Sequence, residues 1–393
     1  MKQDGPPSTY FVEVAEVRSM DRHQAALLRC VTKLKATMPI VGLRNPKIGL
    51  PDLSWEYCDA FDWVIGFQAG QLWLAAALTG DPAFVIAAQA RRQWFRELLR
   101  HPRELDHDTG FQFSLSCVAD WKMTGNEEAR ALALKAASLL AQRHEAGGGY
   151  LKAWNSRAGD PAYSRFAAGR IIADTMQNLA LLYWADREEG QPAYREIADA
   201  HALASSRHLI REDGSTYHTF LFDAGGEPLR GETRQGYAHE SCWARGQAWL
   251  IHGFAQTYAY TRNPQHRQIA AQLAATAETL LGDRAVPPWD YRLPDGETPW
   301  PDSSAGAIMA AGLYLLAASS EEADKARWRA FADRLVDGLL DSCDLSGDAA
   351  AHGLLAHGAA HVPAGRHDNM LPYGDYYFME ALMRSQGHDR FAW

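Results

Sequence analysis

Helical hairpins that recur along the chain limit its possible folds more than any other feature of the sequence. In the clearest case, over residues 71–100, an apolar run (QLWLAAAL) is followed by a polar turn (TGDP) and an amphipathic run (AFVIAAQARRQWFRELLR). Apolar residues spaced three to four apart predict α-helix, and Gly or Pro between two such runs predicts a turn. The same plan recurs around turns at residues 124–126, 189–192, 261–264 and 319–324.

Hairpins that repeat at intervals of about 45 to 75 residues cannot bury their apolar faces singly, so they must stack in an open solenoid or close into a ring. Three longer insertions, at residues 145–163, 211–246 and 286–304, each fall between an outer helix and the next inner one. Loops on one face favour an all-α α/α barrel with a pocket on that face. Strand patterns are scarce, and only Ser215–Asp223 predicts a short hairpin.

The chain of 393 residues contains no internal linker or low-complexity segment. We expect residues 1–20, which include Gly5-Pro6-Pro7, to form an N-terminal arm, and residues 21–393 to form a single barrel domain. The first helix pattern runs from His23 to Lys35.

Composition argues against several classes of function. With 47% hydrophobic and 22% charged residues the chain is typical of a globular protein, and its net charge of -9 provides no basic surface for nucleic acid. An anionic substrate would therefore need a local cation. The 13 Trp and 15 Tyr residues fit a sugar-binding cleft, and they also fit a large apolar core.

The cysteines and the first residues favour the cytoplasm. The 5 cysteines include no C-x-x-C pair, so neither a disulfide framework nor a zinc site is expected. The start, MKQDGPPSTYFVEVAEV, lacks the basic and then apolar pattern of a secretory signal. No apolar run reaches the length of about 18 residues that a membrane helix needs. We expect no membrane partner, and the sequence does not predict the oligomeric state.

Two aspartates stand in contexts that suit catalysis. Asp108 lies in the polar cluster DHDTGF just before an apolar helical run, where it could also be a helix N-cap. Asp174 lies in IIADTMQN among apolar neighbours. Burial there would raise its pKa and suit it to proton transfer near neutral pH, although it could also lie on a solvated polar stripe.

The run from His218 to Trp249 is a second candidate region. Trp243, Arg245 and Trp249 would fall on different sides of an ideal helix, so we expect a loop that runs into a helix there. An Arg between tryptophans could bind a carboxylate by a forked ion pair while a ring stacks on a sugar, or it could lie over a surface aromatic.

No motif predicts a metal or a cofactor. His357 and His361 have i, i+4 spacing, but the segment is broken by Gly and lacks the glutamate of HExxH, so no metal site is expected. The chain contains no P-loop, no GxGxxG after a strand and no GxSxG elbow. Phosphoryl-transfer, nicotinamide and serine-hydrolase chemistry therefore lack support.

Short sequence blocks add a more specific signal: WVIGF from Trp63, LTGD from Leu78, HDTGF from His107, ADTMQN from Ala173, DGSTYH from Asp213, QGY from Gln235, SCWARGQAW from Ser241, DSSAGAI from Asp302 and GDYYFMEA from Gly374. Through these blocks, in this order, the chain resembles the unsaturated glucuronyl hydrolases of glycoside hydrolase family 88 from about residue 50 to its end. No single block identifies the family, but together they are specific.

The resemblance implies an (α/α)6 barrel of six helical hairpins, with the active site on the long-loop face. It implies that Asp108 and Asp174 are the two essential acids, with Asp174 as the proton donor and base. It assigns the binding of the unsaturated uronate and of the sugar rings to six further residues: Trp63, His218, Gln235, Trp243, Arg245 and Trp249.

The implied substrate is a small oligosaccharide left by a polysaccharide lyase, with a 4,5-unsaturated uronic acid at its non-reducing end. Its C4=C5 double bond is an enol ether that can be hydrated, after which the glycosidic bond is lost. Asp174 would protonate C4, and an ionised Asp108 would stabilise the cation. Departures from the family pattern at Gln68-Ala69 and His239-Glu240 leave the leaving sugar and its sulfation open.

Two other functions stay open. The related unsaturated rhamnogalacturonyl hydrolases share the barrel and the chemistry, but tend to read RGNGW where this chain reads RGQAW from Arg245. A catalytically silent helical toroid that binds carbohydrate would have the same fold, since fold alone does not establish catalysis. It would not explain why both acids stand in matched blocks.

Overall fold

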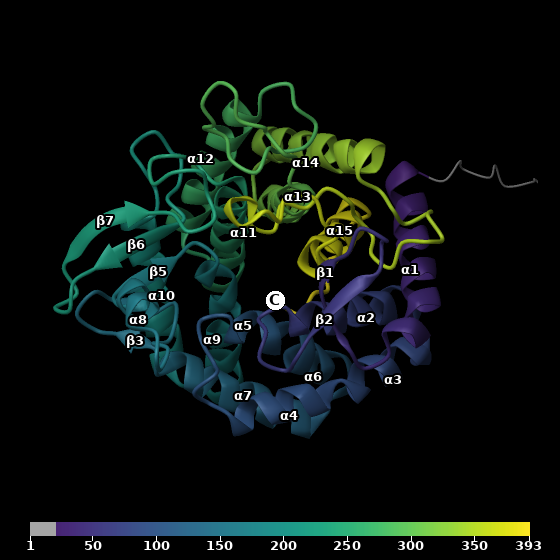
Figure 1. Ribbon diagram of the computed structural model, residues 1–393. Coiled ribbons are helices and arrows are strands. Elements are labelled where there is room, and N and C mark those ends of the chain that lie inside the picture. The colour runs from purple at the N-terminus through teal and green to yellow at the C-terminus, as the bar shows by residue number, and fades with distance from the viewer. Residues whose placement is uncertain (1–20) are drawn as a thin grey trace, which may run out of the picture.

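The computed structural model describes residues 21–393, and the expected arm at residues 1–20 lies outside the described residues. Helices alternate between an inner and an outer layer and close into a ring (Figure 1). The ring closes where α15 (Pro372–Ser385) packs against α2 (Ile65–Thr79). The predicted all-α α/α barrel is confirmed, and the open solenoid is excluded.

Most of the inner layer is buried, and its most apolar helices, α2 and α13, are apolar nearly all round. Close packing also needs small residues: a Cβ at Gly312 of α13 would lie 2.8 Å from the Cα of His252 in α11. The inner segments are α2, then α5 (Thr109–Phe113) with the π-helical turn η1 (Ser114–Val118) and α6 (Ala119–Thr124), then α9 (Thr175–Glu189), α11 (Ala244–Thr261), α13 (Ser303–Ala318) and α15.

The outer layer covers this ring with amphipathic helices: α1 (Arg22–Val41), α3 (Pro82–Ala90), α4 (Arg92–Arg100), α7 (Glu127–Ala141), α10 (Pro192–His208), α12 (Pro264–Leu281) and α14 (Glu322–Ser342). The predicted helix from His23 continues past Lys35 to Val41. The single helix predicted over residues 83–100 is interrupted at Arg91, whose buried guanidinium donates to the carbonyl oxygens of Gly42 (3.0 Å) and Arg44 (2.9 Å).

The connections differ between the two ends of the barrel. Each inner helix leads to the next outer helix by a short turn, and the predicted turns at residues 124–126, 189–192, 261–264 and 319–324 all lie at this end. The return connections from outer to inner helices are longer and include the predicted insertions at 145–163, 211–246 and 286–304. They gather at the opposite end because successive helices alternate in direction.

Short strands in the long connections were mostly missed by the sequence: β1 (Asn45–Gly49), β2 (Trp55–Cys58), β3 (His144–Glu145), β4 (Tyr150–Leu151), β5 (Arg170–Ile172), β6 (Thr219–Phe222) and β7 (Pro228–Glu232), with the helices α8 (Pro161–Ala167) and η2 (Val362–Ala364). The predicted hairpin Ser215–Asp223 is wrong in extent, because β6 is the central strand between β5 and β7. The turn comes later, where Asp223 Oδ1 accepts hydrogen bonds from the N–H groups of Gly225 (2.8 Å) and Glu227 (2.9 Å).

Candidate active site

A pocket of about 370 Å³ opens at the long-loop end of the barrel. Its walls come from the long connections and from the first residues of inner helices. Carboxyl, guanidinium and aromatic groups share its surface, which is lined by Phe61, Asp62, Trp63, Asp106, His107, Asp108, Trp154, Arg157, Tyr163, Ile172, Asp174, Arg234, Gln235 and Arg245.

Both predicted acids enter this pocket from the start of an inner helix. Asp108 directly precedes α5, and Asp174 directly precedes α9. Asp108 occupies the N-cap position of α5, as the sequence allowed, but neither aspartate side chain makes a capping hydrogen bond. Both carboxyl groups are therefore free of a structural role in the helix start.

Asp174 is buried, at 9% exposure, and its Oδ2 has no hydrogen-bond partner within residues 21–393. Burial raises the pKa of Asp174 to about 7, while the Arg245 guanidinium and the Trp249 indole N–H act in the opposite direction. A carboxyl group with such a pKa can give and take a proton near neutral pH. The solvated-stripe interpretation of Asp174 does not fit, because the side chain is buried at the wall of the pocket.

Asp108 is equally buried, and burial is the first cause that raises its pKa well above the usual range. The negative charges of Asp106, Asp174 and Asp62 raise it further, and Arg143 only partly opposes them. Like charges this close cannot all be ionised. Burial and these charges favour the protonated form of Asp108 in the free pocket, whereas the resemblance led to the expectation of an ionised Asp108.

Trp63, Gln235 and Arg245 also line the pocket, as the resemblance implied. The Arg245 fork, however, is turned into the protein. Its Nη1 donates to Asp302 Oδ2 (2.5 Å) and to the Ala359 carbonyl oxygen (2.8 Å), and its Nη2 donates to the carbonyl oxygen of the next residue (2.9 Å). A forked ion pair between Arg245 and a substrate carboxylate does not fit this geometry.

The remaining predicted residues, His218, Trp243 and Trp249, lie behind the pocket lining at 2%, 3% and 0% exposure. Trp243 is the residue before α11, so the expected loop that runs into a helix is confirmed. Trp249 packs against Phe111 with ring centres 5.2 Å apart and presents no face to the pocket. The expectation of a sugar-stacking face on Trp249 does not fit this burial.

His218 is held in one tautomer by its neighbours. Its Nδ1 accepts hydrogen bonds from the backbone N–H groups of Arg234 (3.1 Å) and Gln235 (3.2 Å), and burial lowers its pKa well below the usual range. The neutral ring therefore carries its proton on Nε2. That N–H has no partner within the described chain and is a free donor.

Nine of the lining residues were not predicted, and four of them come from two of the long insertions: Trp154, Arg157, Tyr163 and Arg234. The guanidinium of Arg157 lies 3.8 Å from the Tyr163 ring centre, and that of Arg234 lies 5.5 Å from it. Neither pairs with a carboxylate in residues 21–393. The insertions at 145–163 and 211–246 were the available signal, but no spacing in them indicated which side chains would reach the pocket.

One group of potential metal ligands lies in the pocket. Ligand atoms of Asp106, His107 and Asp108 lie within 4.8 Å of one another. Asp106 already accepts from the Asp108 N–H (2.9 Å), and His107 Nδ1 is hydrogen-bonded to Thr175 Oγ1 (3.1 Å). We therefore assign no metal to this group.

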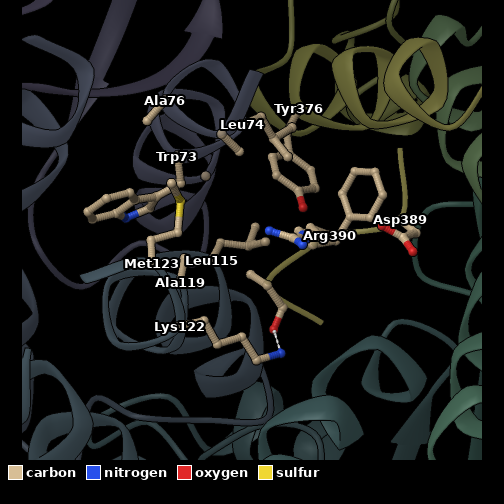
Figure 2. Close-up of a pocket in the computed structure, with 14 residues that line it drawn as sticks. Trp73, Leu74, Ala76, Leu115, Ala119, Lys122, Met123, Tyr376, Asp389 and Arg390 are labelled. Atoms are coloured by element: carbon tan, nitrogen blue, oxygen red, sulfur yellow. Dashed lines mark hydrogen bonds between the residues drawn. The ribbon is translucent and has the colours of Figure 1, made fainter. Parts of the chain in front are cut away.

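A second cavity, of about 490 Å³, lies at the opposite end of the barrel (Figure 2). Trp63, just before α2, lines the first pocket and Ala76 of α2 lines the second, and such a stretch of helix rises about 20 Å. Apart from Asp389, the described residues that line this cavity carry no carboxyl group, so it lacks a pair of acids. The polar pocket is the candidate active site.

An α/α barrel whose pocket holds two buried carboxyl groups beside aromatic rings and cations has the features of a glycosidase site. The chain belongs to Glycosyl Hydrolase Family 88, which matches residues 47–391. The predicted family and the enzyme class, a glycoside hydrolase, are therefore confirmed. None of the helices in residues 21–393 is long and apolar enough to cross a membrane.

The chain is similar to several characterised proteins. It is 41% identical over 348 residues to the unsaturated glucuronyl hydrolase of Bacillus sp. (strain GL1), covering 87% of this chain and 91% of the relative. The crystal structure of that relative matches with a TM-score of 0.87 and 37% identity, over 93% of this chain and 97% of the other. The unsaturated chondroitin disaccharide hydrolase of Streptococcus pyogenes serotype M1 is 36% identical over 86% of this chain and 85% of its own.

A further solved structure, from Streptococcus agalactiae, is a mutant unsaturated glucuronyl hydrolase complexed with dGlcA-GalNAc6S. It matches with a TM-score of 0.81 and 28% identity, over 94% of this chain and 93% of that chain.

Proposed function

We propose that the pocket removes a 4,5-unsaturated uronic acid from the non-reducing end of small oligosaccharides that polysaccharide lyases produce. The observation that carries this proposal is the Asp174 carboxyl group, which is buried, unpaired at Oδ2 and has a pKa of about 7, in a barrel of family 88. The names of the relatives, glucuronyl and chondroitin disaccharide hydrolases, support the substrate class.

In this proposal Asp174 carries out both proton transfers. Its protonated carboxyl group donates to C4, where the electron pair of the double bond forms the new C–H bond. The ring oxygen stabilises the cation at C5, water adds there, and the proton of the water returns to Asp174. The resulting hemiketal opens, which breaks down the acetal at C1 and releases the leaving sugar. Because the protonated form starts the reaction, kcat falls as pH rises through about 7.

Asp108 acts as a neutral hydrogen-bond donor to the sugar in this proposal. Its raised pKa supports this role, since burial and the neighbouring carboxylates favour its protonated form. The pair resembles other enzyme sites in which one of two acids is held neutral so that it can donate a hydrogen bond.

Substrate recognition then rests on donors and rings at different depths of the pocket. The amide of Gln235 serves the uronate carboxylate, with His218 held behind it against the Gln235 backbone N–H, and the guanidinium groups of Arg157 and Arg234 attract the anionic substrate at the mouth. Arg245 orders the wall around Asp302 and places a positive charge near Asp174. The sugar rings lie against Trp63, Trp154 and Tyr163, since Trp243 and Trp249 are buried.

The other two functions have less support. The related rhamnogalacturonyl activity on pectin fragments is disfavoured by the names of the relatives and by the RGQAW sequence from Arg245. A silent carbohydrate-binding toroid would not need two acids with raised pKa values in one pocket. We further propose a cytoplasmic location, which the five unpaired cysteines support.

The test follows the ultraviolet absorbance of the conjugated double bond while purified protein is mixed with unsaturated disaccharides from chondroitin, hyaluronan, heparin and pectin. We expect loss of absorbance, unchanged by a metal chelator, with the first three substrates favoured over the pectin product. No loss on any substrate would overturn the proposal, and a clear preference for the pectin product would favour the rhamnogalacturonyl alternative.

A further inference from the structure

The last residues of the chain, Gly387–Trp393, turn back into the barrel at the end opposite the active site. The chain leaves α15 at Gly387, whose φ of 85° suits glycine, and His388 N–H donates to the Met383 carbonyl oxygen (3.1 Å). From there the segment enters the ring, and the end of the chain lies at the ring centre in Figure 1. Asp389 and Arg390 form part of the wall of the far-end cavity in Figure 2.

Two side chains anchor this segment before its last residue. Lys122 Nζ donates to the Ala392 carbonyl oxygen (2.8 Å), and the Arg384 guanidinium lies 4.0 Å from the ring centre of Phe391. Neighbouring protein atoms lower the pKa of Lys122 to about 8, although its side chain is exposed to solvent. The tail provides this ammonium group with an acceptor.

Trp393 itself completes a buried ionic cluster. Its indole N–H donates to Glu380 Oε2 (2.8 Å), while Glu380 Oε1 accepts from Arg384 (2.8 Å) and lies 3.2 Å from His252 Nε2. Glu380 is 0% exposed, so each of these partners contributes to the stability of its charge.

The Trp393 ring also supports the floor of the active site from below. It stacks on Tyr377 with ring centres 6.0 Å apart and an interplanar angle of 14°, and it meets Phe111 edge-on at 6.3 Å. Phe111 and Tyr377 in turn contact Trp249 at 5.2 Å and 5.4 Å. The indole N–H of Trp249 lowers the pKa of Asp174, although it makes no hydrogen bond within the described residues. One aromatic layer therefore separates Trp393 from the surroundings of Asp174.

We propose that Trp393 is a positioning residue for the reaction: the segment Gly387–Trp393 closes the barrel axis from the far end, and the Trp393 ring holds the aromatic layer under Asp174 in place and dry. The inference rests on the proposed function, because that proposal names the reaction that Trp393 would support.

Loss of the Trp393 side chain would leave a gap between Glu380 and the aromatic layer. The Glu380 carboxylate, which accepts from Trp393 and Arg384, borders this gap and makes it polar enough to admit water. Water below the layer would weaken the burial that holds the Asp174 proton, so the pKa of Asp174 would fall. The other charged or titratable groups near Asp174 are Asp108, Arg245, Tyr373 and Tyr377, and all of them stay unchanged in the variants below.

The first experiment compares Trp393→Ala, Trp393→Phe and the control Arg390→Ala, which alters an exposed residue of the same segment. For Trp393→Ala we expect kcat to be roughly 10-fold lower than in the parent and KM to stay within about twofold. The pH at which kcat has fallen by half should be about 0.5 to 1 unit lower than in the parent. Trp393→Phe keeps a ring and should retain kcat within about threefold, and added indole should partly restore Trp393→Ala. An unchanged pH midpoint and kcat in a folded Trp393→Ala protein would overturn the proposal.

The second experiment needs no substrate, so it separates this inference from the proposed function. Because the pKa of Asp174 is about 7 in the folded protein and about 4 in the unfolded chain, stability falls as pH rises through this interval. Asp174→Asn removes that loss. In the Trp393→Ala background the stability difference between Asp174→Asn and its parent should stop growing at a lower pH and should be smaller in total, measured by thermal unfolding across pH.

If Trp393→Ala does not fold, Trp393→Leu takes its place in both experiments, because a smaller apolar side chain still opens the axis. If the pH dependence of stability has the same midpoint with and without the Trp393 substitution, the positioning role is overturned, even if turnover is found. If no variant turns over substrate, the proposed reaction is overturned. A shifted midpoint in the pH dependence of stability would still support the positioning of the Asp174 surroundings by Trp393.

Discussion

The two ends of the barrel are built from the same helices but differ in what they can do. The far end has short turns and the larger cavity, about 490 Å³, lined mainly by apolar side chains such as Trp73 and Leu115. The site end has long connections and a pocket of about 370 Å³ lined by acids, arginines and aromatic rings. Cavity size therefore does not identify the site in this protein, whereas the chemistry of the lining does.

Helix direction adds to this difference. The inner helices α9 and α11 begin at the site end, directly after Asp174 and Trp243. The N-terminal end of a helix carries partial positive charge and favours anions. Together with Arg157 and Arg234, this field favours an anionic sugar in the pocket, although the whole chain has a net charge of -9.

The strongest test of the site end is Asp174→Asn. The amide cannot donate a proton to C4 or take one from water, so we expect kcat to fall by about 10⁴-fold. The measurement is turnover of an unsaturated disaccharide, with thermal unfolding at about pH 5 and pH 8 to show that the variant folds. Activity within tenfold of the parent would show that Asp174 is not the proton donor.

A smaller loss is expected for Asp108→Asn, about 10² to 10³-fold, because an amide keeps a hydrogen-bond donor but not its geometry or acidity. The pH profile of the residual activity sharpens the comparison. If Asp108 is protonated in the parent, the uncharged Asn leaves the pKa of Asp174 near 7. A midpoint well below that value would mean that Asp108 is ionised and that its charge raises the pKa of Asp174.

The arginines at the mouth should matter less than the acids. In the double variant Arg157→Gln with Arg234→Gln, we expect kcat/KM to fall by about 10-fold, mainly through KM, and to depend less on salt. Arg165→Gln is the matched control, since it removes an exposed arginine from the same connection outside the pocket. A loss of equal size in the control would show that only the overall charge is important.

The sequence predicted the ring and the face of the site because both depend on local patterns. Short turns such as Thr124–Asn126 and long insertions such as residues 145–163 are visible in composition, and together they divide the barrel into two ends. The strands β1 and β2 were not predicted, because their short segments show no alternation and pair only with each other across a bulge.

The site was predicted less completely, for a physical reason. The resemblance placed Asp108, Asp174, Gln235 and Arg245 at one pocket, but it could not show which way each side chain turns. The Arg245 fork faces Asp302 and carbonyl groups, which are separated from it in sequence by more than 50 residues. Such contacts depend on how three connections meet, and local spacing carries no information about them.

We expect the smallest effect from a substitution at the far end of the barrel that does not alter the contacts of Trp393. Met123 lines the mouth of the far-end cavity and is 42% exposed, so Met123→Ala should change stability by less than about 0.5 kcal/mol. We expect kcat/KM within about twofold of the parent and an unchanged pH midpoint, because no described contact of Met123 reaches the aromatic layer below Asp174. A loss of tenfold or more, in a variant with a normal unfolding temperature, would contradict the division of roles between the two ends. It would mean that the far-end cavity itself, and not only the Trp393 ring, takes part in the function.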